Sequence, residues 1–410
     1  SMELRMLCLP LRLQKNFVLH SMQEQKFEVS DVFNTSFEKE YEKYASNIRL
    51  LKVAHHIMSC RTKEMGAFVY KCEDCEHESI SYCSCRDRMC PKCQSQSHHE
   101  WISKIEKVVL DCIHLHAVVT VPSELNPIAL ANKELFYTLL FQTVSEAVLT
   151  LCHNPKHLGA TPGMTAILHT WGQKLDFHPH IHMAITAGGV DDENNWVDAK
   201  RTKKGDVYLF PVKALSLIVK KRLLKKLRHV EKIGLIEFNH DKFTSLLKEA
   251  DGKKWISYVK EPFKGSKGVF AYIGNYTHRS AISNSRIKNV TESHTTFQYR
   301  DYADKNKQKM LTLANSEFIR RFLFHTLKRG FVRIRHYGIY SVPNRRTKLV
   351  KARESLNKDS QQRFAEKSDN KKEEKFVLRC PCCGGIMRKE SVRPIYNRMY
   401  INYIHNKSSL

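Results

Sequence analysis

The feature that most constrains this chain is a short histidine-rich segment with a period of two. In residues 177–185 (FHPHIHMAI), His180 and His182 alternate with Ile181 and Met183. Side chains alternate between the two faces of a strand, so the apolar set can be buried while both imidazoles lie on the opposite face. Imidazole nitrogens are common ligands of divalent metal ions. The segment therefore predicts a strand that is half core and half metal site.

Two imidazoles alone leave a metal ion under-coordinated, so a third ligand is expected nearby. Residues 164–190 read as two antiparallel strands joined by a short turn. Gln173, in this predicted turn, is the expected third ligand, with His178 and Asp176 as alternatives.

A second His-apolar-His pattern competes with the first. His114 and His116 lie in residues 110–122, which also read as a strand. Local spacing does not exclude this pair as the metal pair. Alternatively, it is a neighbouring strand that lends one His to the site.

Two tyrosines could supply a nucleophile. Tyr272 and Tyr276 lie in residues 271–279 (AYIGNYTHR), and on a helix they are one turn apart and face the same way. A phenolate can attack a phosphodiester and hold the cut end covalently, while a divalent ion polarises the phosphate. With the His pair, they predict a metal-assisted tyrosine nuclease.

The charge of the chain points to a polyanionic partner. Lys and Arg number 68 against 42 Asp and Glu, so the net charge is 68 − 42 = +26, which favours nucleic acid. Residues 212–233 predict a basic amphipathic helix, whose charged face is either solvated or in contact with phosphate. The arginines expected to contact DNA are Arg279, Arg286, Arg320, Arg321, Arg333 and Arg335.

The 13 cysteines indicate structural zinc in a reducing compartment. Cys72 and Cys75, followed by Cys90 and Cys93, form two CxxC pairs that predict four thiolates around one Zn²⁺. The sequence leaves the role of Cys60, Cys83 and Cys85 open: they are free thiols, or some of them hold a second ion with His77, His98 or His99. A third pair, Cys380 and Cys383, is half of a zinc ribbon, for which Cys8, Cys60, Cys85 and His405 are candidate partners.

Compartment and domain limits follow from composition. We find no charged-then-apolar leader and no run of about 18 apolar residues, so we expect a soluble cytoplasmic protein, associated with the bacterial nucleoid and not with a membrane. The expected divisions are a helical segment over 1–58, a zinc-binding domain over 59–108, a nuclease domain over 109–343, and a charged linker with the last CxxC over 344–410.

Several motifs in this order resemble one known family. They are the cysteine block over 60–94, the strand over 116–122, the HPHIH motif over 178–182 followed by Gly188 and Gly189, the tyrosine motif over 272–279, and the segments 318–322 and 333–338. With them the chain resembles the rolling-circle insertion-sequence transposases of bacteria, two-tyrosine HUH enzymes related to eukaryotic Helitrons.

The resemblance implies an α+β fold and a reaction. The fold is an HUH-type central antiparallel sheet flanked by helices, with an N-terminal zinc-binding module and a C-terminal helical or zinc-ribbon-like segment. Tyr272 or Tyr276 would cut single-stranded or melted DNA at the transposon end, leaving a 5′-phosphotyrosine and a free 3′-OH, with Mg²⁺ or Mn²⁺ on His180 and His182.

Two other functions are weighed against this one. A replication initiator would nick an origin by the same chemistry without moving DNA. A zinc-dependent nucleic-acid-binding regulator would carry out no chemistry. The sequence leaves open which tyrosine acts first, which DNA is recognised, and the oligomeric state.

Overall fold

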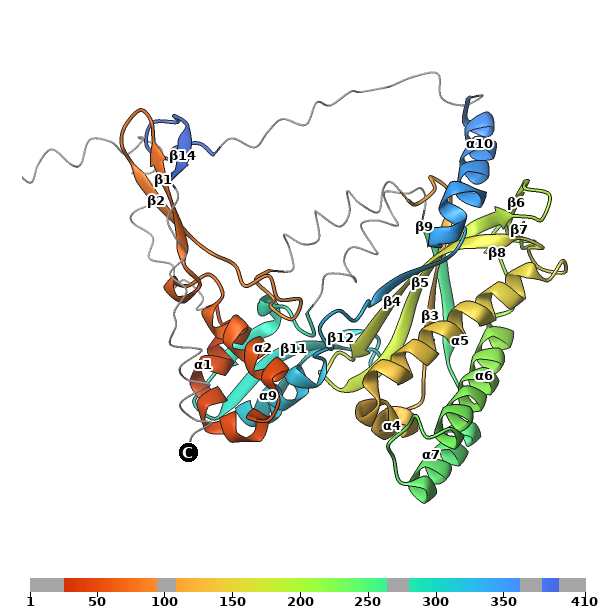
Figure 1. The fold of residues 1–410 in the computed structure, drawn as a ribbon, viewed down its shortest axis with the longest axis horizontal. Helices are drawn as coiled ribbons and strands as arrows, with labels where there is room; N and C mark the ends of the chain where they lie inside the picture. Colours follow the sequence, from red (N-terminus) through yellow and green to blue (C-terminus); the bar gives the residue numbers. More distant parts are fainter. Residues whose placement is uncertain (1–25, 94–107, 264–279, 362–377, 391–410) are drawn as a thin grey trace, which may run out of the picture.

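The computed structural model describes residues 26–93, 108–263, 280–361 and 378–390. These residues form two lobes, with a small cysteine-rich hairpin extending from one of them (Figure 1). We call the larger the sheet lobe and the other the N-terminal lobe. The fold is α+β with antiparallel sheets, as the sequence predicts.

The sheet lobe is built on one antiparallel sheet in the order β13-β4-β5-β3-β9, with β6 paired to β5. Its strands are β3 (His114–Thr120), β4 (Thr161–Trp171), β5 (Phe177–Val190), β6 (Trp196–Asp198), β9 (Ser257–Phe263) and β13 (Ile334–Gly338). The predicted metal strand, β5, therefore lies at the centre. The predicted strand and hairpin over 110–122 and 164–190 are present.

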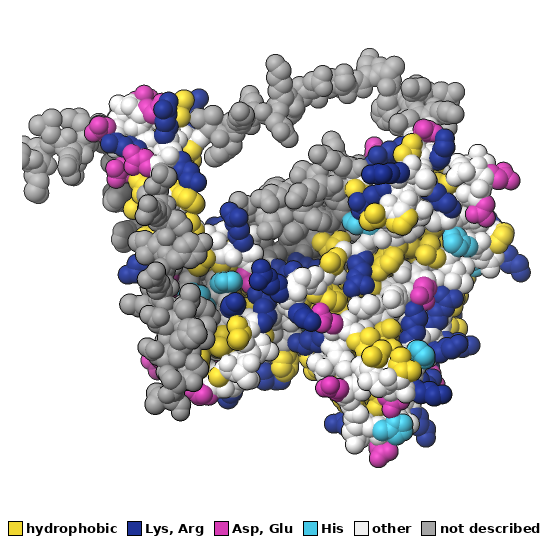
Figure 2. All heavy atoms as spheres, in the orientation of Figure 1, with side chains coloured by type: hydrophobic (Ala, Val, Ile, Leu, Met, Phe, Trp, Pro, Cys, Tyr) yellow, Lys and Arg dark blue, Asp and Glu magenta, His cyan; other side chains and the backbone are white. Residues whose placement is uncertain are grey.

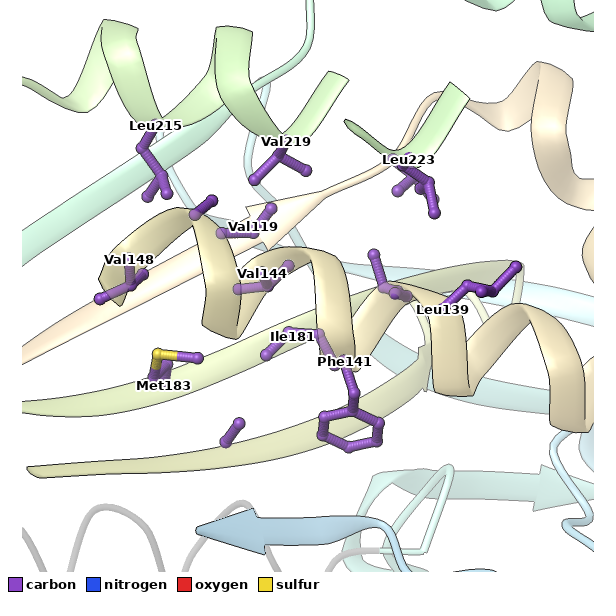
Figure 3. Packing of buried hydrophobic residues seen from close by; sticks show 14 of the residues in the cluster. Val119, Leu139, Phe141, Val144, Val148, Ile181, Met183, Leu215, Val219 and Leu223 are labelled. Carbon is purple, nitrogen blue, oxygen red and sulfur yellow. The ribbon is translucent and has the colours of Figure 1, made fainter. Parts of the chain in front are cut away.

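Helices cover one face of this sheet. They are α4 (Asn126–Ala131), α5 (Lys133–His153), α6 (Val212–Lys232) and α7 (His240–Gly252). Ile181 and Met183 from β5 pack against Val144 and Val148 from α5 (Figure 3). The alternation read from the sequence places this apolar set in the core, which leaves the imidazoles on the other face.

α5 is a 21-residue helix with twelve buried residues. Among the described residues it alone has the length and hydropathy of a membrane-crossing helix, and most of it is buried inside the protein. Its apolar side chains are therefore accounted for by the sheet and by α6.

The N-terminal lobe has its own core. It combines α1 (Val29–Glu40), α2 (Ile48–Ser59) and α9 (Asn315–Phe324) with a sheet of β10 (Ile287–Val290), β11 (His294–Asp301) and β12 (Lys307–Ala314). Phe33, Phe297, Phe318 and Phe322 are fully buried here and stack edge-on or face to face. Leu175, from the turn between β4 and β5, is buried in the same core.

Three remaining parts lie around the lobes. β1 (Ala67–Cys72) and β2 (Glu78–Tyr82) form a hairpin, and β14 (Met387–Glu390) adds to it as a third strand. β7 (Lys200–Arg201) and β8 (Val207–Tyr208) form a small ribbon. α10 (Lys348–Gln361) follows β13 at the far end of the sheet lobe (Figure 1).

Candidate active site and metal centres

Three imidazoles meet on the face of the sheet away from α5. They belong to His169 on β4 and to His180 and His182 on β5, and their ligand atoms lie within 4.8 Å of one another. The strand register explains the meeting, because His169 is directly opposite His180. Cross-strand partners have side chains on the same face. β4 and β5 thus bring three imidazole nitrogens close enough together to bind one metal ion.

In His180 and His182, the contacts of Nδ1 with other groups leave Nε2 to bind a metal ion. His180 Nδ1 lies 2.7 Å from the carbonyl oxygen of His178, so the proton sits on Nδ1 and is donated to that oxygen. The Nε2 atoms of His180 and His182 are 3.1 Å apart. Burial lowers the pKa of His180 to about 4. The imidazole is therefore neutral at neutral pH, which is the form that binds metal ions.

His116 makes a contact behind this cluster. Its Nε2 lies 3.0 Å from His182 Nδ1, with the two rings parallel and 5.2 Å apart. His116 is buried. It therefore holds the ring of His182 from the side opposite His180, as outer partners commonly hold metal-ligating histidines. His114 instead bonds Tyr340 Oη at 2.9 Å, away from the cluster.

The structure does not support Gln173 as the third ligand. Its amide nitrogen donates to Tyr302 Oη at 3.0 Å, and its amide oxygen accepts from the Arg300 backbone at 3.4 Å. Both partners belong to the hairpin of β11 and β12, so the turn directs Gln173 toward the N-terminal lobe. His169 occupies the place that the sequence assigned to Gln173.

A β-bulge explains why simple strand register does not predict that His169 lies opposite His180. Trp171 pairs with Phe177, and counting back from this pair in simple register places Pro179 opposite His169. The register shifts between His169 and Trp171, so His180 takes that place instead. A bulge adds one residue on one strand. The parity of β4 alone, with Thr165, Ile167 and His169 on one face, is the signal that was present.

The predicted nucleophiles, Tyr272 and Tyr276, and Arg279 lie outside the described residues. The other five arginines all make contacts within the protein. Arg320 and Arg321 both pair with Glu317 at 2.6 Å. Arg286 donates to the Gln298 carbonyl at 2.7 Å, and Arg335 lies over the ring of Phe141. Burial, with the nearby Arg88, lowers the pKa of Arg333 to about 10.

The basic helix α6 lies on the other side of the sheet from the imidazoles. Lys226 pairs with Glu146 and Arg222 donates to Thr150, both on α5. Lys221, Lys225 and Arg228 are exposed. Lys and Arg side chains are spread widely over the molecular face in Figure 2.

Eight of the cysteines lie in two sets of four. This arrangement corrects the prediction that Cys72, Cys75, Cys90 and Cys93 form a single site. The two CxxC pairs belong to different sets, because the hairpin of β1 and β2 separates them. The first set is Cys60, Cys85, Cys90 and Cys93, and the second is Cys72, Cys75, Cys380 and Cys383. Four sulfurs within 4.8 Å of one another fit the thiolate coordination of Zn²⁺.

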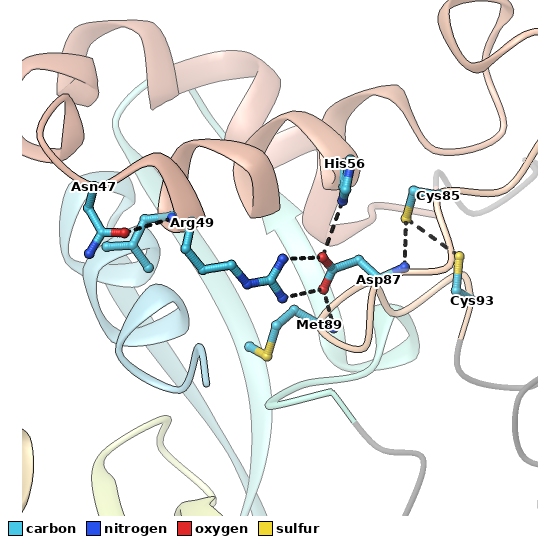
Figure 4. A network of polar contacts seen from close by, with 8 residues as sticks. Asn47, Arg49, His56, Cys85, Asp87, Met89 and Cys93 are labelled. Carbon is cyan, nitrogen blue, oxygen red and sulfur yellow. Dashed lines mark hydrogen bonds and ion pairs between the residues drawn. The ribbon is translucent and has the colours of Figure 1, made fainter. Parts of the chain in front are cut away.

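The first cysteine set is anchored to α2 through Asp87 (Figure 4). The Asp87 carboxylate accepts from Arg49 at 2.8 Å and from the Met89 backbone at 2.9 Å, and its Oδ2 lies 3.2 Å from His56 Nδ1. Burial alone would raise the pKa of this carboxyl, but the hydrogen bonds from His56, Arg49 and Met89 lower it to about 2. No local sequence pattern predicts this network.

The chain is similar to known transposases over most of its length. Residues 163–348 match a family described as "Putative transposase", and residues 32–121 match "Transposase zinc-binding domain". The chain is 36% identical to "Putative transposase y4qJ" of Sinorhizobium fredii, over 80% of this chain and 84% of that protein. It is 27% identical to "Transposase for insertion sequence element IS801" of Pseudomonas savastanoi pv. phaseolicola, over 69% of this chain and 68% of that protein. No solved structure matches the chain significantly.

The zinc-binding domain, the basic charge and these relatives define a DNA-processing enzyme of the transposase class. Within that class, the chain belongs to the IS91 family of insertion-sequence transposases, which includes the IS801 enzyme.

Proposed function

We propose that this transposase cuts and rejoins single-stranded DNA at the ends of its element through a covalent tyrosine intermediate. The observation that carries the proposal is the meeting of His169, His180 and His182 on the face of the sheet away from α5. Such a set is suited to hold a divalent ion beside a scissile phosphate. The transposase names of the relatives favour transposition over origin nicking.

In the proposed reaction, Tyr272 or Tyr276 loses its phenolic proton and its oxygen attacks the phosphorus. The bond from phosphorus to the 3′ oxygen breaks, and that oxygen takes up a proton. The products are a 5′-phosphotyrosine and a free 3′-OH. The second tyrosine repeats the step on the target strand. The target 3′-OH then attacks the first phosphotyrosine, which joins the two strands and gives its proton to the released tyrosine. The 3′-OH of the other element end resolves the second phosphotyrosine in the same way.

A divalent ion on the three imidazoles would neutralise phosphate charge and assist departure of the 3′ oxygen. The donor set is all nitrogen, which suits Mn²⁺ better than Mg²⁺, because Mg²⁺ prefers oxygen ligands. His116 would keep the ring of His182 in its orientation. We therefore expect Mn²⁺ to support activity at lower concentration than Mg²⁺.

The test incubates the protein with labelled single-stranded DNA from an element end and Mn²⁺, followed by a denaturing gel. We expect a labelled protein band that is absent when Tyr272 and Tyr276 are both replaced by Phe, and absent in His180→Ala. The matched control is Tyr82→Phe, at an exposed tyrosine at the end of β2. A band that persists in the double Phe variant places the nucleophile elsewhere.

Transfer of the cut strand to a target distinguishes the proposed transposase from a replication initiator and from a binding-only regulator. With a second, unlabelled target strand present, a transposase joins the labelled strand to the target. A replication initiator nicks without joining to unrelated targets. A binding-only regulator forms no covalent band with any metal ion.

A further inference from the structure

We propose that Cys72, Cys75, Cys380 and Cys383 form a second structural zinc site, which fastens the C-terminal CxxC segment to the hairpin of β1 and β2. The region that matches the zinc-binding domain of other transposases is residues 32–121, which contains only the first CxxC of this set. The second CxxC lies far beyond it. No comparison therefore assigns this site.

The two CxxC turns have the same local geometry. The Cys72 amide donates to the His77 carbonyl at 2.9 Å, and the Asp74 amide points at Cys72 Sγ at 3.4 Å. In the second turn the Cys380 amide donates to the Gly385 carbonyl at 2.8 Å, and the Cys382 amide points at Cys380 Sγ at 3.4 Å. The first cysteine of each turn is therefore held by the same pair of backbone contacts.

The turns face each other at the spacing that one zinc ion requires. Cys72 Sγ is 3.4 Å from Cys383 Sγ, and Cys75 Sγ is 3.6 Å from Cys380 Sγ. Four sulfurs at about 2.3 Å from a tetrahedral Zn²⁺ are about 3.8 Å apart. The two turns thus contribute two sulfurs each to one tetrahedron, as in a zinc ribbon.

The strands around the site pair the same two segments. β14 runs antiparallel to β1, with Cys72 opposite Met387 and Tyr70 opposite Lys389. The buried cluster here consists of Cys72, Cys380 and Met387, with Tyr70 packed against it. So little apolar surface cannot stabilise three short strands by burial alone, and a metal ion supplies the missing stability in such small modules.

The zinc ion would join parts of the chain that are 305 to 311 residues apart in the sequence. β14 follows the long charged segment after α10, and its pairing with β1 returns the chain to the N-terminal lobe (Figure 1). Zinc at this site therefore determines whether the C-terminal segment stays with the N-terminal hairpin.

The first experiment measures zinc per chain by mass spectrometry after exhaustive dialysis. We expect Cys380→Ser with Cys383→Ser to lose one zinc relative to the parent protein. The control is Cys382→Ser, because Cys382 lies in the same turn but outside the set of four. The proposal is overturned if the double variant keeps the zinc content of the parent, or if the control loses one zinc.

The second experiment tests the fastening directly. A protease site is engineered between residues 361 and 378 of the full chain, and a tag is added at the C-terminus. After cleavage we expect the tagged fragment to stay bound to the zinc-loaded parent and to Cys382→Ser, and to leave after chelation or in the double variant. A fragment that leaves the zinc-loaded parent on cleavage contradicts the proposal. Neither readout involves DNA cleavage, so the result is independent of the proposed function.

Discussion

At the scale of single residues, we expect the candidate metal site to depend on His116, which lies outside the cluster of three imidazoles. Nε2 of His116 contacts Nδ1 of His182, on the opposite side of that ring from the Nε2 that faces His180. Metal affinity commonly falls about 10- to 100-fold when such an outer partner is removed. His116 is therefore a positioning residue, and its effect should be seen in binding as well as in activity.

We predict that His116→Phe weakens Mn²⁺ binding by about 10-fold or more, because the ring of His182 loses its partner. Electron paramagnetic resonance of free Mn²⁺ during a titration measures the affinity. The control is His336→Gln on β13, whose Nδ1 contacts Thr165 on the same face of the sheet. Equal affinities of His116→Phe and the parent would contradict the prediction.

A second prediction concerns Asp87, whose folded-state pKa is about 2. A carboxyl with a lowered pKa stabilises the fold fully above its unfolded value, near pH 4, and this contribution is lost as the pH falls toward 2. We expect Asp87→Asn to cost about 2 kcal/mol at pH 7 and less at pH 3, since one pKa unit corresponds to about 1.4 kcal/mol. Urea unfolding of the variant and the parent at both pH values measures the difference.

The matched control for Asp87 is Asp192→Asn, at an exposed loop carboxylate. It should change the free energy of unfolding by less than about 0.5 kcal/mol. A cost for Asp87→Asn that is unchanged from pH 7 to pH 3 would show that the network does not act through charge.

At the scale of elements, periodicity predicted most of the sheet lobe. The alternation in β5 and the length of α6 gave both elements within a residue or two, because one face of each is buried. The apolar stretch after β3 forms two helices, α4 and α5, which are separated at Asn132. β12 was not predicted, since none of its side chains is fully buried and its inward apolar pattern is limited to Leu311 and Leu313.

Long-range pairing could not be predicted from local patterns. The spacing of two CxxC pairs within residues 72–93 favours one zinc site, yet the two pairs separate because β1 and β2 extend between them. The sulfur nearest to that of Cys72 belongs to Cys383, in a turn 311 residues further along the chain. Nothing in the spacing along the chain encodes such a contact.

The burial of α5 in the core leads to a prediction about the stability of the sheet lobe. Leu140 is fully buried between the sheet and α6, so Leu140→Ala should lower the free energy of unfolding by about 2–4 kcal/mol. Leu217→Ala, at a leucine on α6 that is 57% exposed, is the control and should cost far less. Urea unfolding measures both. Equal costs would mean that α5 is not packed in the core of the protein.

At the scale of the whole molecule, the two lobes meet at the turn that presents the imidazoles. Leu175, in this turn, is buried in the core of the N-terminal lobe. Arg321 donates to the Lys174 carbonyl at 3.1 Å, and His325 Nδ1 lies 3.1 Å from Thr170 Oγ1. The N-terminal lobe, which carries the zinc-binding domain, thereby holds the end of the hairpin from which His169 and His180 extend.

This arrangement predicts that a core substitution distant from the metal ligands alters metal binding. Leu175→Ala removes the side chain that fixes the turn, so we expect a loss of about 2–4 kcal/mol in unfolding free energy. We also expect weaker Mn²⁺ binding at a temperature where the variant remains folded, because the positions of His169 and His180 become less restricted. Leu235→Ala, at an exposed leucine, is the control. Leu175→Ala could instead lose stability and still bind Mn²⁺ with the affinity of the parent. In that case the N-terminal lobe does not influence the metal site, and the sheet alone defines its geometry.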